Sequence, residues 1–562
     1  LNLRRFAAPA VGTALTLAYA SYAVSTITDD SAETPTNPTI SLLMSACSVL
    51  ESRPSPSLLA TSPSAISESS LEDTVETITN WSGTHSVTLQ KVHAPENRKE
   101  LEDLVSSTEG PIRPMGSALS PNGLSFAPPG TSCVSLSLMD RVLEVNAEKR
   151  TVRVEAGCRV EQVIEALRPH GLTLPNLASI AAQQVGGFVN AGAHGTGALI
   201  PPVDDFVLSM TIVTPALGAV TVSRGDVGLQ KVVFDMCRVG LGAFGVAAEY
   251  TLSCVPAHEL VETTTVLTRA EAVESLPSLL KDHRHMRYMW IPYEDAVVVV
   301  TNDPLVGENF EAKEAGVQDP LRPLKDLLLA NEPSLDTSLV DSMGMGELRD
   351  KLLDINPLST PWIRKVNAAE HEFWKLAQGT RCLPSDKLLQ FDCGGQQWVQ
   401  EVCFPTGSLA SPNSNDLSFM LKLLSSLEER DLPAPSPIEQ RWTASSTSSM
   451  SPANTTKNPA DTVYSWIGII MYLTSDDPKK RDAVTDRFQN EYRDVLEAVG
   501  DEYKAVTHWA KQELPPEGSP DRQTRLKKIK ERLAEVYPVE DFKAMRRLLD
   551  PENRCGNELI QE

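Results

Sequence analysis

The chain has 562 residues, of which 41% are hydrophobic and 22% are charged, a composition typical of a globular protein with more than one domain. Its formal net charge of −23 argues against a nucleic-acid partner, because phosphate binding requires a basic surface, and favours a basic protein partner instead. The nine cysteines include no C-x-x-C pair, and the nine histidines show no ligand spacing. We therefore predict free thiols, no disulfide framework and no metal site.

The N-terminal segment differs in composition from the rest of the chain. Arg4 and Arg5 precede an uncharged stretch, residues 6–28, which as a helix would be about 34 Å long and would span a bilayer. Three interpretations stay open for residues 1–28: a membrane anchor, a secretory signal and an organelle-targeting leader. In an anchor, Arg4 and Arg5 would mark the inner side of the membrane. Residues 29–74 are rich in Ser, Thr and Pro and are predicted to be a linker.

Folded structure is expected to begin near Val75, with strands and helices recognisable from their periodicity. Alternating apolar residues on either side of a short polar turn predict a hairpin, and an amphipathic run ended by Gly171 predicts a helix. The predicted elements up to residue 256 are a helix over 96–107, hairpin strands 142–145 and 151–155, a helix over 159–170, and two strands within 207–222.

A glycine-rich run at residues 240–245 matches the dinucleotide fingerprint G-x-G-x-x-G. The fingerprint requires a strand before it and a helix after it. Here a predicted helix, 230–237, precedes the run and a predicted strand, 246–253, follows it. We therefore interpret the run as a glycine-rich turn, not as a Rossmann-type site.

The second half of the chain alternates strands with helices. Residues 465–472 form an apolar run typical of a buried strand, whereas the charged segments near the C-terminus have helical periodicity. The other predicted elements are strands over 288–292 and 296–301, helices over 418–430, 481–511 and 522–549, and a long excursion with some helix over 305–342.

Two runs of small residues stand out, residues 113–123 and 186–197. Such turns expose backbone N–H groups that can converge on a phosphate, and glycine allows close approach because it lacks a Cβ. Either run alone would pass for an ordinary loop. Two of them in one β-rich region indicate a ligand with a long, phosphate-bearing body.

Several longer runs resemble the plant mitochondrial type of galactono-1,4-lactone dehydrogenase, within the vanillyl-alcohol-oxidase-like flavoproteins. The resemblance covers most of the chain, from about Asn80 to Asp550, and implies an α+β fold with an FAD-binding domain and a substrate (cap) domain. The matching runs are 113–123, 192–198, 391–399, 435–443, 508–511 and 550–551.

In that family the two small-residue loops hold the flavin, so the resemblance implies which residues bind FAD here. Leu119 stands where covalent relatives have a histidine linked to the flavin, which implies non-covalent FAD. His508 and Lys511 match a motif beside the flavin, where a positive charge stabilises the reduced ring. The implied FAD-binding residues are Arg113, Gly116, Ser117, Ala118, Leu119, Ser120, Ala178, Ser179, Gly192, His194, Gly195, Thr196, Gly197, His508 and Lys511.

Glu439 and Arg441 are the predicted catalytic pair. They are two residues apart, so in a strand they face the same side. A carboxylate can bind a sugar hydroxyl or take its proton, and a guanidinium can stabilise developing negative charge. A Glu-x-Arg sequence without a family match would more often be a surface ion pair, but the resemblance implies that both residues contact the substrate.

The resemblance also draws attention to three smaller features. Cys393 matches a cysteine near the substrate pocket and is a candidate redox-sensitive thiol. Ala178 matches a position that restricts oxygen access to the reduced flavin, which favours a dehydrogenase. Ala181 and Ala182 stand where the plant enzymes carry Arg-Glu, which predicts altered flavin contacts or reduced activity.

We therefore expect FAD-dependent oxidation of L-galactono-1,4-lactone to ascorbate with cytochrome c as acceptor, at the mitochondrial inner membrane with the body in the intermembrane space. One alternative is a structural or assembly subunit of respiratory complex I, and another is an aldonolactone oxidase that uses oxygen. The expected domains are an anchor or leader, 1–28; a linker, 29–74; an FAD-binding domain, 75–256; a cap domain, 257–490; and returning C-terminal helices, 491–562.

Overall fold

The computed structural model describes residues 76–307, 310, 319–390 and 394–562. The predicted anchor and linker, residues 1–74, and Cys393 lie outside this range. Within it no helix is both long enough and apolar enough to cross a membrane. The described cysteines are all free thiols, as predicted.

The first half of the chain forms a β-rich domain with an antiparallel five-stranded sheet in the order β10-β9-β11-β7-β6. The predicted hairpin is confirmed as β6 (Val142–Asn146) and β7 (Thr151–Glu155), and the paired strands as β9 (Val207–Thr214) and β10 (Gly218–Ser223). A smaller parallel sheet, β3-β5-β4, lies beside it (Lys91–His93, Ser132–Ser135 and Ile112–Met115).

The helices of this half also follow the sequence pattern. Helix α3 spans Arg98–Ser107, and α4 (Val160–Leu167) continues as a 3-10 turn to His170 before Gly171 adopts a φ of 63°. Helix α6 (Gly228–Cys237) precedes the glycine-rich turn, and β11 (Val246–Ser253) follows it. The helix-then-strand order confirms that this turn is not a Rossmann fingerprint.

The second half is built on a large antiparallel sheet in the order β16-β13-β15-β14-β19-β20-β17-β18, with β21 paired to β17. The alternating and apolar runs explain its strands, because one face packs in a core and the other faces a cavity. The strands are β13 (Glu259–Leu267), β14 (His285–Trp290), β15 (Val297–Pro304), β16 (Gly379–Pro384), β17 (Gln397–Ser408), β18 (Ser411–Pro412), β19 (Ile438–Ala444), β20 (Thr462–Tyr472) and β21 (Val506–Thr507).

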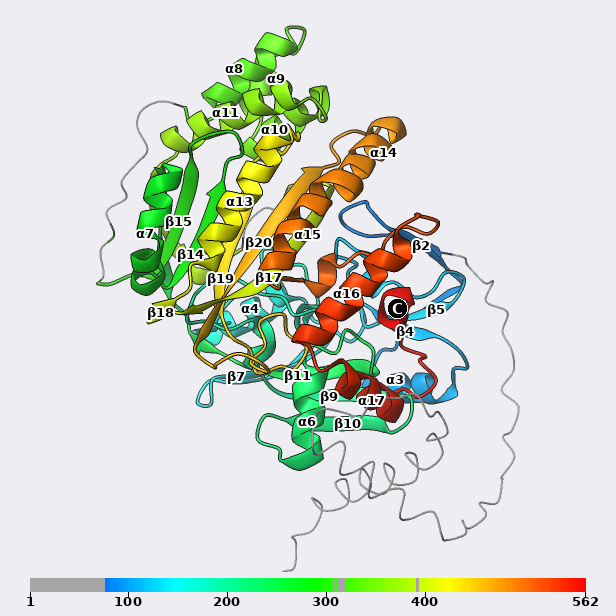
Figure 1. Ribbon diagram of the computed structural model, residues 1–562. Coiled ribbons are helices and arrows are strands. Elements are labelled where there is room, and N and C mark those ends of the chain that lie inside the picture. Colours follow the sequence, from blue (N-terminus) through cyan, green and yellow to red (C-terminus); the bar gives the residue numbers. More distant parts are fainter. Residues whose placement is uncertain (1–75, 308–309, 311–318, 391–393) are drawn as a thin grey trace, which may run out of the picture.

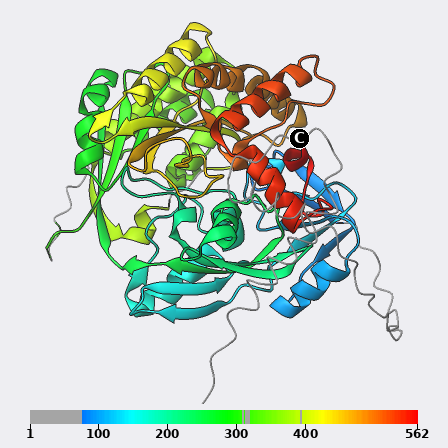
Figure 2. The same cartoon turned by 60° about the horizontal axis from the view of Figure 1, so that its bottom comes forward.

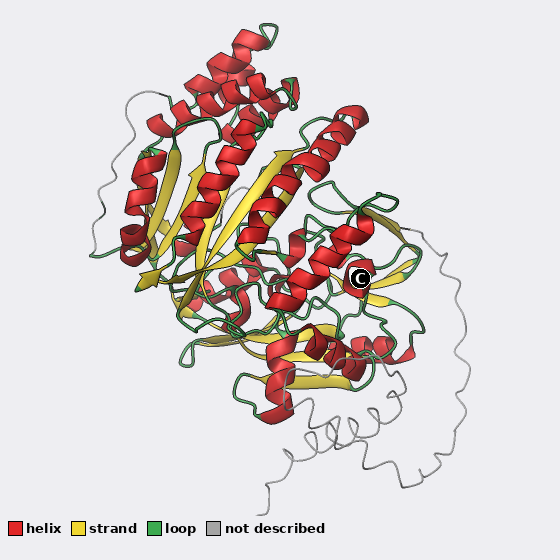
Figure 3. Cartoon of the chain, in the orientation of Figure 1, coloured by secondary structure: helices red, strands yellow, loops and turns green. Residues whose placement is uncertain are grey.

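Helices cover one face of this sheet and cap one end of it (Figures 1 and 3). Helices α7 (Arg269–Asp282), α13 (Asn415–Glu429) and α15 (Arg493–Glu502) pack their apolar sides against the sheet in one continuous core. A helical group at the end of the sheet has its own core. Its first two helices lie within the predicted excursion over 305–342, and its other two lie beyond it. The group consists of α8 (Arg322–Asn331), α9 (Thr337–Ser342), α10 (Met345–Ile355) and α11 (Thr360–Leu376).

The predicted helix over 481–511 is wrong only after Glu502. Helix α14 (Pro478–Arg487), a π-helical turn (Phe488–Tyr492) and α15 form one run that stops at Glu502. Lys504 then adopts a φ of 54°, which ends the helix, and β21 pairs with β17. The predicted domain boundaries at 256 and 490 stay predictions; residue 490 falls inside the π-helical turn.

The C-terminal segment returns to the first domain, and Figure 2 shows its last helices beside the N-terminal strands. Helices α16 (Arg522–Val536) and α17 (Val539–Leu549) lead to Arg554, whose carbonyl accepts a 2.8 Å hydrogen bond from the Ile112 amide. The buried Arg113 side chain donates to the carbonyls of Leu124, Leu241 and Cys555, the last at 2.6 Å. Arg113 therefore ties three distant segments together.

We predict that Arg113→Met destabilises the fold. The substitution leaves the carbonyls of Leu241 and Cys555 without this donor, while Leu124 keeps only its bond from Asn557. A loss of more than about 3 kcal/mol in the free energy of unfolding is expected. Thermal denaturation of the apoprotein would measure it. An exposed arginine on α11, Arg364, serves as the matched control: Arg364→Met should change the midpoint little, and equal midpoints for the two variants would contradict the prediction.

Candidate active site

A cavity of about 710 Å³ lies between the two domains, within the usual range of roughly 300–1,000 Å³ for ligand sites. Its walls come from the loop after β4, the loop after β8 (Leu172–Thr173), helices α10 and α11, and strands of the large sheet. Most of the predicted site residues line it. They are Gly116, Ser117, Ala118, Leu119, Ser120, Ala178, Ser179, His194, Glu439, Arg441, His508 and Lys511.

The other predicted residues lie outside this wall. Gly192, Gly195, Thr196 and Gly197 form a joint between the domains, and the Gly197 amide donates to the Trp442 carbonyl at 2.7 Å. A Cβ on Gly195 would lie 2.2 Å from Asn176 Oδ1, so close packing requires glycine there.

Arg113 lines a smaller cavity of about 100 Å³ that shares Gly116, Ser120 and Gly187 with the main one. The Arg113 guanidinium itself is held by carbonyls of the protein.

The floor of the cavity is a cross-strand row of the large sheet. Glu401 on β17 pairs with Gly468 on β20, and Gly468 pairs with Glu439 on β19. Glu439 in turn pairs with Met289 on β14. Gly468 therefore leaves an open space between two glutamates, since it has no side chain to fill it.

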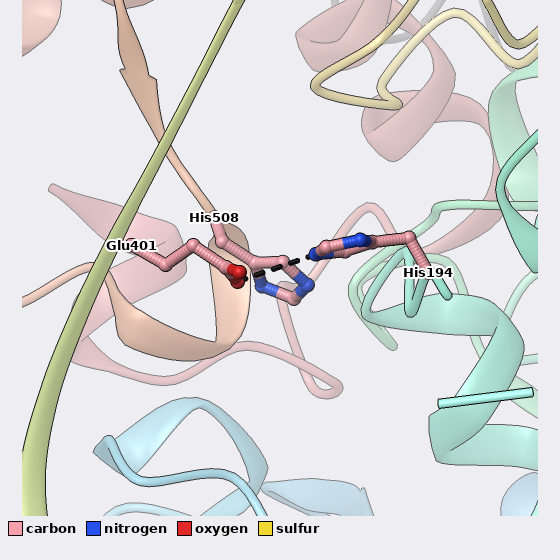
Figure 4. A group of neighbouring side chains, drawn as sticks. All are labelled: His194, Glu401 and His508. Atoms are coloured by element: carbon pink, nitrogen blue, oxygen red, sulfur yellow. Dashed lines mark hydrogen bonds and ion pairs between the residues drawn. The ribbon is translucent and has the colours of Figure 1, made fainter. Parts of the chain in front are cut away.

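Glu401 is the centre of the polar network at this floor. One of its oxygens accepts a hydrogen bond from Arg441 at 2.6 Å, and the other accepts one from Lys511 Nζ at 2.7 Å. His194 Nε2 lies 3.3 Å from the second oxygen, and its ring stacks on Trp466 at a centroid distance of 3.7 Å. Figure 4 shows Glu401, His194 and His508 converging from separate elements.

The network governs the ionisation of its members. Burial alone would raise the pKa of Glu401, but Lys511, Arg441 and His194 together hold it well below its ordinary value. Burial, with Arg441 next, lowers the pKa of His194 to about 4, and burial with Lys511 lowers that of His508 well below its ordinary range. At neutral pH the carboxylate is therefore charged and both imidazoles are neutral.

His194, Glu401 and His508 also meet the distance criterion for a metal site, since one ligand atom from each lies within 4.8 Å of the others. Their surroundings do not suit a cation. Both Glu401 oxygens already accept from Arg441 and Lys511, and a metal ion would be placed beside these two positive charges. We interpret the group as an internal ion-pair network.

Sequence reasoning missed Glu401. A glutamate in the middle of a strand, flanked by Val399 and Cys403, is a usable signal because an unpaired buried carboxylate is very costly. Its partners could not be deduced, since they come from β19, the Gly192–Gly197 joint and the turn after β21.

The wall of the first domain fits FAD. Gly187 lies in it, and a Cβ there would meet no atom within 4 Å, so the wall is open to a flat group. Ala118 has a φ of 51°, and its carbonyl accepts from the Trp81 amide at 2.9 Å, which fixes the shape of the loop. The smaller cavity extends the main one along the glycine-rich turn at 242–245, so the pair suits an elongated ligand.

Ala181 and Ala182 lie beside the cavity wall and do not line it. The Ala181 carbonyl accepts from the Glu161 amide at 3.1 Å, and the Ala182 carbonyl accepts from Ser117 Oγ at 3.3 Å. Their backbone therefore supports Ser117 in the wall.

Comparison with known proteins agrees with this geometry. Residues 89–223 match the model of an FAD-binding domain, and residues 250–562 match that of D-arabinono-1,4-lactone oxidase. Among solved structures, cholesterol oxidase from B. sterolicum has the same fold, with a TM-score of 0.66 over 89% of this chain and 99% of that chain at 14% identity. The fold and cavity thus define a two-domain FAD-dependent oxidoreductase.

Curated relatives narrow this class. The chain is 42% identical to a mitochondrial L-galactono-1,4-lactone dehydrogenase of Brassica oleracea, over 88% of this chain and 83% of the relative. A rice counterpart (Oryza sativa subsp. japonica) is also 42% identical, and L-gulonolactone oxidase of Bos taurus is 27% identical over 77% of this chain and 88% of the relative. The chain belongs to the family of FAD-dependent aldonolactone oxidoreductases that includes the L-galactono-1,4-lactone dehydrogenases.

We predict that Glu401→Gln destabilises the protein at neutral pH, because Lys511 and Arg441 would stay buried without their counter-charge. The expected loss is about 3–5 kcal/mol in the free energy of unfolding. A carboxylate with a depressed pKa stabilises the fold above its ordinary pKa and loses that effect as the pH falls through the depressed value. The difference from the parent protein should therefore be full at pH 7 and shrink below about pH 4.5.

Denaturation midpoints measured across this pH range would check both statements. Glu502→Gln, which removes an exposed partner of Lys422, serves as control and should have little effect at any pH. A Glu401→Gln penalty that does not change between pH 7 and pH 3 would contradict the assignment.

We predict that the space at Gly468 is required for catalysis. A Cβ there would have only ordinary contacts of 4.0 Å with Glu401, so Gly468→Ala should fold and bind flavin normally. Gly468→Val projects further methyl groups over the floor and should lower aldonolactone turnover by about tenfold or more. Steady-state kinetics per bound flavin would measure this, with the exposed Gly225→Val as control; unchanged turnover in Gly468→Val would contradict it.

Proposed function

We propose that this protein oxidises L-galactono-1,4-lactone at its C2 hydroxyl. The observation that carries the proposal is the Glu439–Arg441 pair, which lies in the wall of a cavity shared with the FAD-binding loops. The hydroxyl loses its proton, and the hydrogen on C2 leaves as hydride with both electrons of the C2–H bond. The C2–O bond becomes a C2=O bond. The 2-keto product then enolises to ascorbate.

Glu439 is the group best placed to hold the hydroxyl and take its proton. Both Glu401 oxygens accept short hydrogen bonds within the protein, whereas Glu439 faces guanidinium groups only at longer range. Its oxygens lie 3.4 Å from Arg441 Nε and 3.8 Å from Arg287 Nη1. A substrate hydroxyl can therefore donate to Glu439 without breaking a short ion pair.

Arg441 and Lys511 bring positive charge to the same wall, and Glu401 fixes the position of both. Such preorganised charge stabilises negative charge that develops on a substrate oxygen without rearrangement during the reaction. FAD, held by the loop around Gly116–Ser120 and by Ala178 and Ser179, would supply the acceptor for the hydride. Leu119 offers no nucleophile, so we propose that FAD is bound non-covalently.

For the electron acceptor we propose cytochrome c, a basic protein suited to a chain of net charge −23. Ala178 in the cavity wall is the residue proposed to limit access of oxygen. The alternative electron acceptor is oxygen, since a related protein is named L-gulonolactone oxidase.

We also propose a mitochondrial location, because the Brassica and rice relatives, each 42% identical, are named mitochondrial. Residues 6–28 are the proposed anchor in the inner membrane, with the folded body in the intermembrane space. Association with respiratory complex I would be compatible with this position. Fractionation of mitochondria carrying the chain with and without residues 1–28 tests the anchor: equal release of both by carbonate would contradict it.

The decisive experiment is the flavin spectrum of the purified protein under anaerobic conditions. We expect bound flavin that acid precipitation releases and that L-galactono-1,4-lactone bleaches. Glu439→Gln should keep the flavin and bleach at least about a hundredfold more slowly. Protein without flavin, or flavin that the lactone never bleaches, would contradict the proposal.

We predict that reduction of cytochrome c depends strongly on salt. Its second-order rate should fall about tenfold as ionic strength rises from about 0.01 M to about 0.15 M, because the Debye length shrinks from about 30 Å to about 8 Å. An uncharged dye acceptor serves as control and should show no such dependence. Peroxide formed in step with lactone consumption would favour the oxidase instead.

A further inference from the structure

The active-site cavity has a second polar end, formed by the helical group that caps the large sheet. Helix α11 contributes Glu370, Phe373 and Trp374 to its wall, and α10 contributes Glu347 and Arg349. None of these residues belongs to the flavin loops or to the Glu401 network. This end therefore has a different task from the end where the flavin is proposed to lie.

The position of Glu370 relative to the catalytic strand follows from Asn367, one turn earlier on α11. The Asn367 side chain donates to the carbonyls of Pro292 and Ala434 and accepts from the Ser436 amide, each at 3.0 Å. This fastens α11 to the segment just before β19. Residues three apart on a helix share a face, so Glu370 faces the same segment.

The order of the lining residues along β19 shows where each polar group lies along the length of the cavity. Pro437, Glu439 and Arg441 all line the cavity at alternate positions. Consecutive strand residues rise about 3.3 Å, so Pro437 and Arg441 are about 13 Å apart. Arg441 lies at the flavin end with Glu401 and Lys511, and Glu370 lies at the Pro437 end, with Glu439 between them.

One carboxyl oxygen of Glu370 has no hydrogen-bond partner. The residue is 1% exposed, and Oε2 makes no hydrogen bond within the described part of the chain. Burial raises the pKa of Glu370 to about 7, against the opposing effects of Arg349 and of a hydrogen bond with Ser436. A buried carboxyl oxygen without a partner costs free energy unless a ligand supplies the hydrogen bond.

We propose that Glu370 is a specificity-determining residue that hydrogen-bonds the exocyclic polyol side chain of the aldonolactone. The proposal rests on the proposed function, since Glu439 and Arg441 must hold the reacting hydroxyl on the lactone ring. With the ring at Glu439, the side chain of a six-carbon lactone extends toward Pro437. Phe373 and Trp374 there provide apolar contact with its carbons, and Glu370 provides the hydrogen bond.

The test compares two lactones that differ in this side chain. L-galactono-1,4-lactone carries two exocyclic hydroxyls, and the five-carbon D-arabinono-1,4-lactone carries one. In Glu370→Leu we expect KM for the six-carbon lactone to rise about tenfold, with kcat changed less than about threefold. KM for the five-carbon lactone should change much less, so the preference for the longer side chain falls.

Two further variants separate recognition from folding. Glu370→Gln keeps the shape and the hydrogen-bonding groups and should retain most of the preference. Glu372→Gln, at an exposed position of the same helix that pairs with Lys375, should match the parent protein. Flavin content is measured for every variant. If Glu370→Leu fails to fold, Glu370→Ala, which removes the carboxylate without placing a branched side chain in the cavity wall, is the deciding variant with the same expected change.

The outcomes distinguish this proposal from the proposed function. A parent protein that oxidises neither lactone would overturn both. A parent protein that is active, with a folded Glu370 variant whose ratio of KM values for the two lactones is unchanged, would overturn only the role of Glu370. Loss of rate on both lactones to the same degree would also overturn it, because that pattern indicates a structural role.

Discussion

The site depends on one buried carboxylate, Glu401, and on the two cations that neutralise it. Removing a carboxylate and two basic groups from water costs several kcal/mol for each ion, and only close pairing offsets this. The pairing distances of 2.6 and 2.7 Å leave little freedom to Arg441 and Lys511. Strand β19, strand β17 and the turn after β21 must therefore be in place together for any one of them to be stable there.

The same requirement explains the joint at Gly192–Gly197. This loop places His194 against Glu401 and Trp466, and its last glycine bonds to the backbone of β19. Gly195 and Gly197 are required there because Asn176 and neighbouring backbone occupy the space of a side chain. The position of the Gly192–Gly197 loop in the first domain is thus coupled to the position of β19 in the second. The coupling runs through backbone contacts, which deform less easily than side chains.

Local patterns predicted most of the elements, because alternation and helical periodicity report which face of an element is buried. The hairpin at 142–155 and the helix-then-strand order around residues 240–245 could be foreseen in this way. The end of α15 could not be foreseen, since the charged sequence continues past Glu502. The change from helix to strand depends on pairing of β21 with β17.

Glu401 and Glu370 were missed for a related reason: their importance comes from register and packing between segments far apart in the chain. Most of the residues assigned by resemblance line the main cavity. Arg113 lines the smaller one, and its guanidinium binds carbonyls of the protein.

The bond from Arg113 to the carbonyl of Cys555 joins residues 442 positions apart. The loop that begins the cofactor site is therefore made hundreds of residues before the residue that secures it. A contact of such high sequence separation forms slowly, because the entropy of closing the intervening chain is lost before the contact is gained.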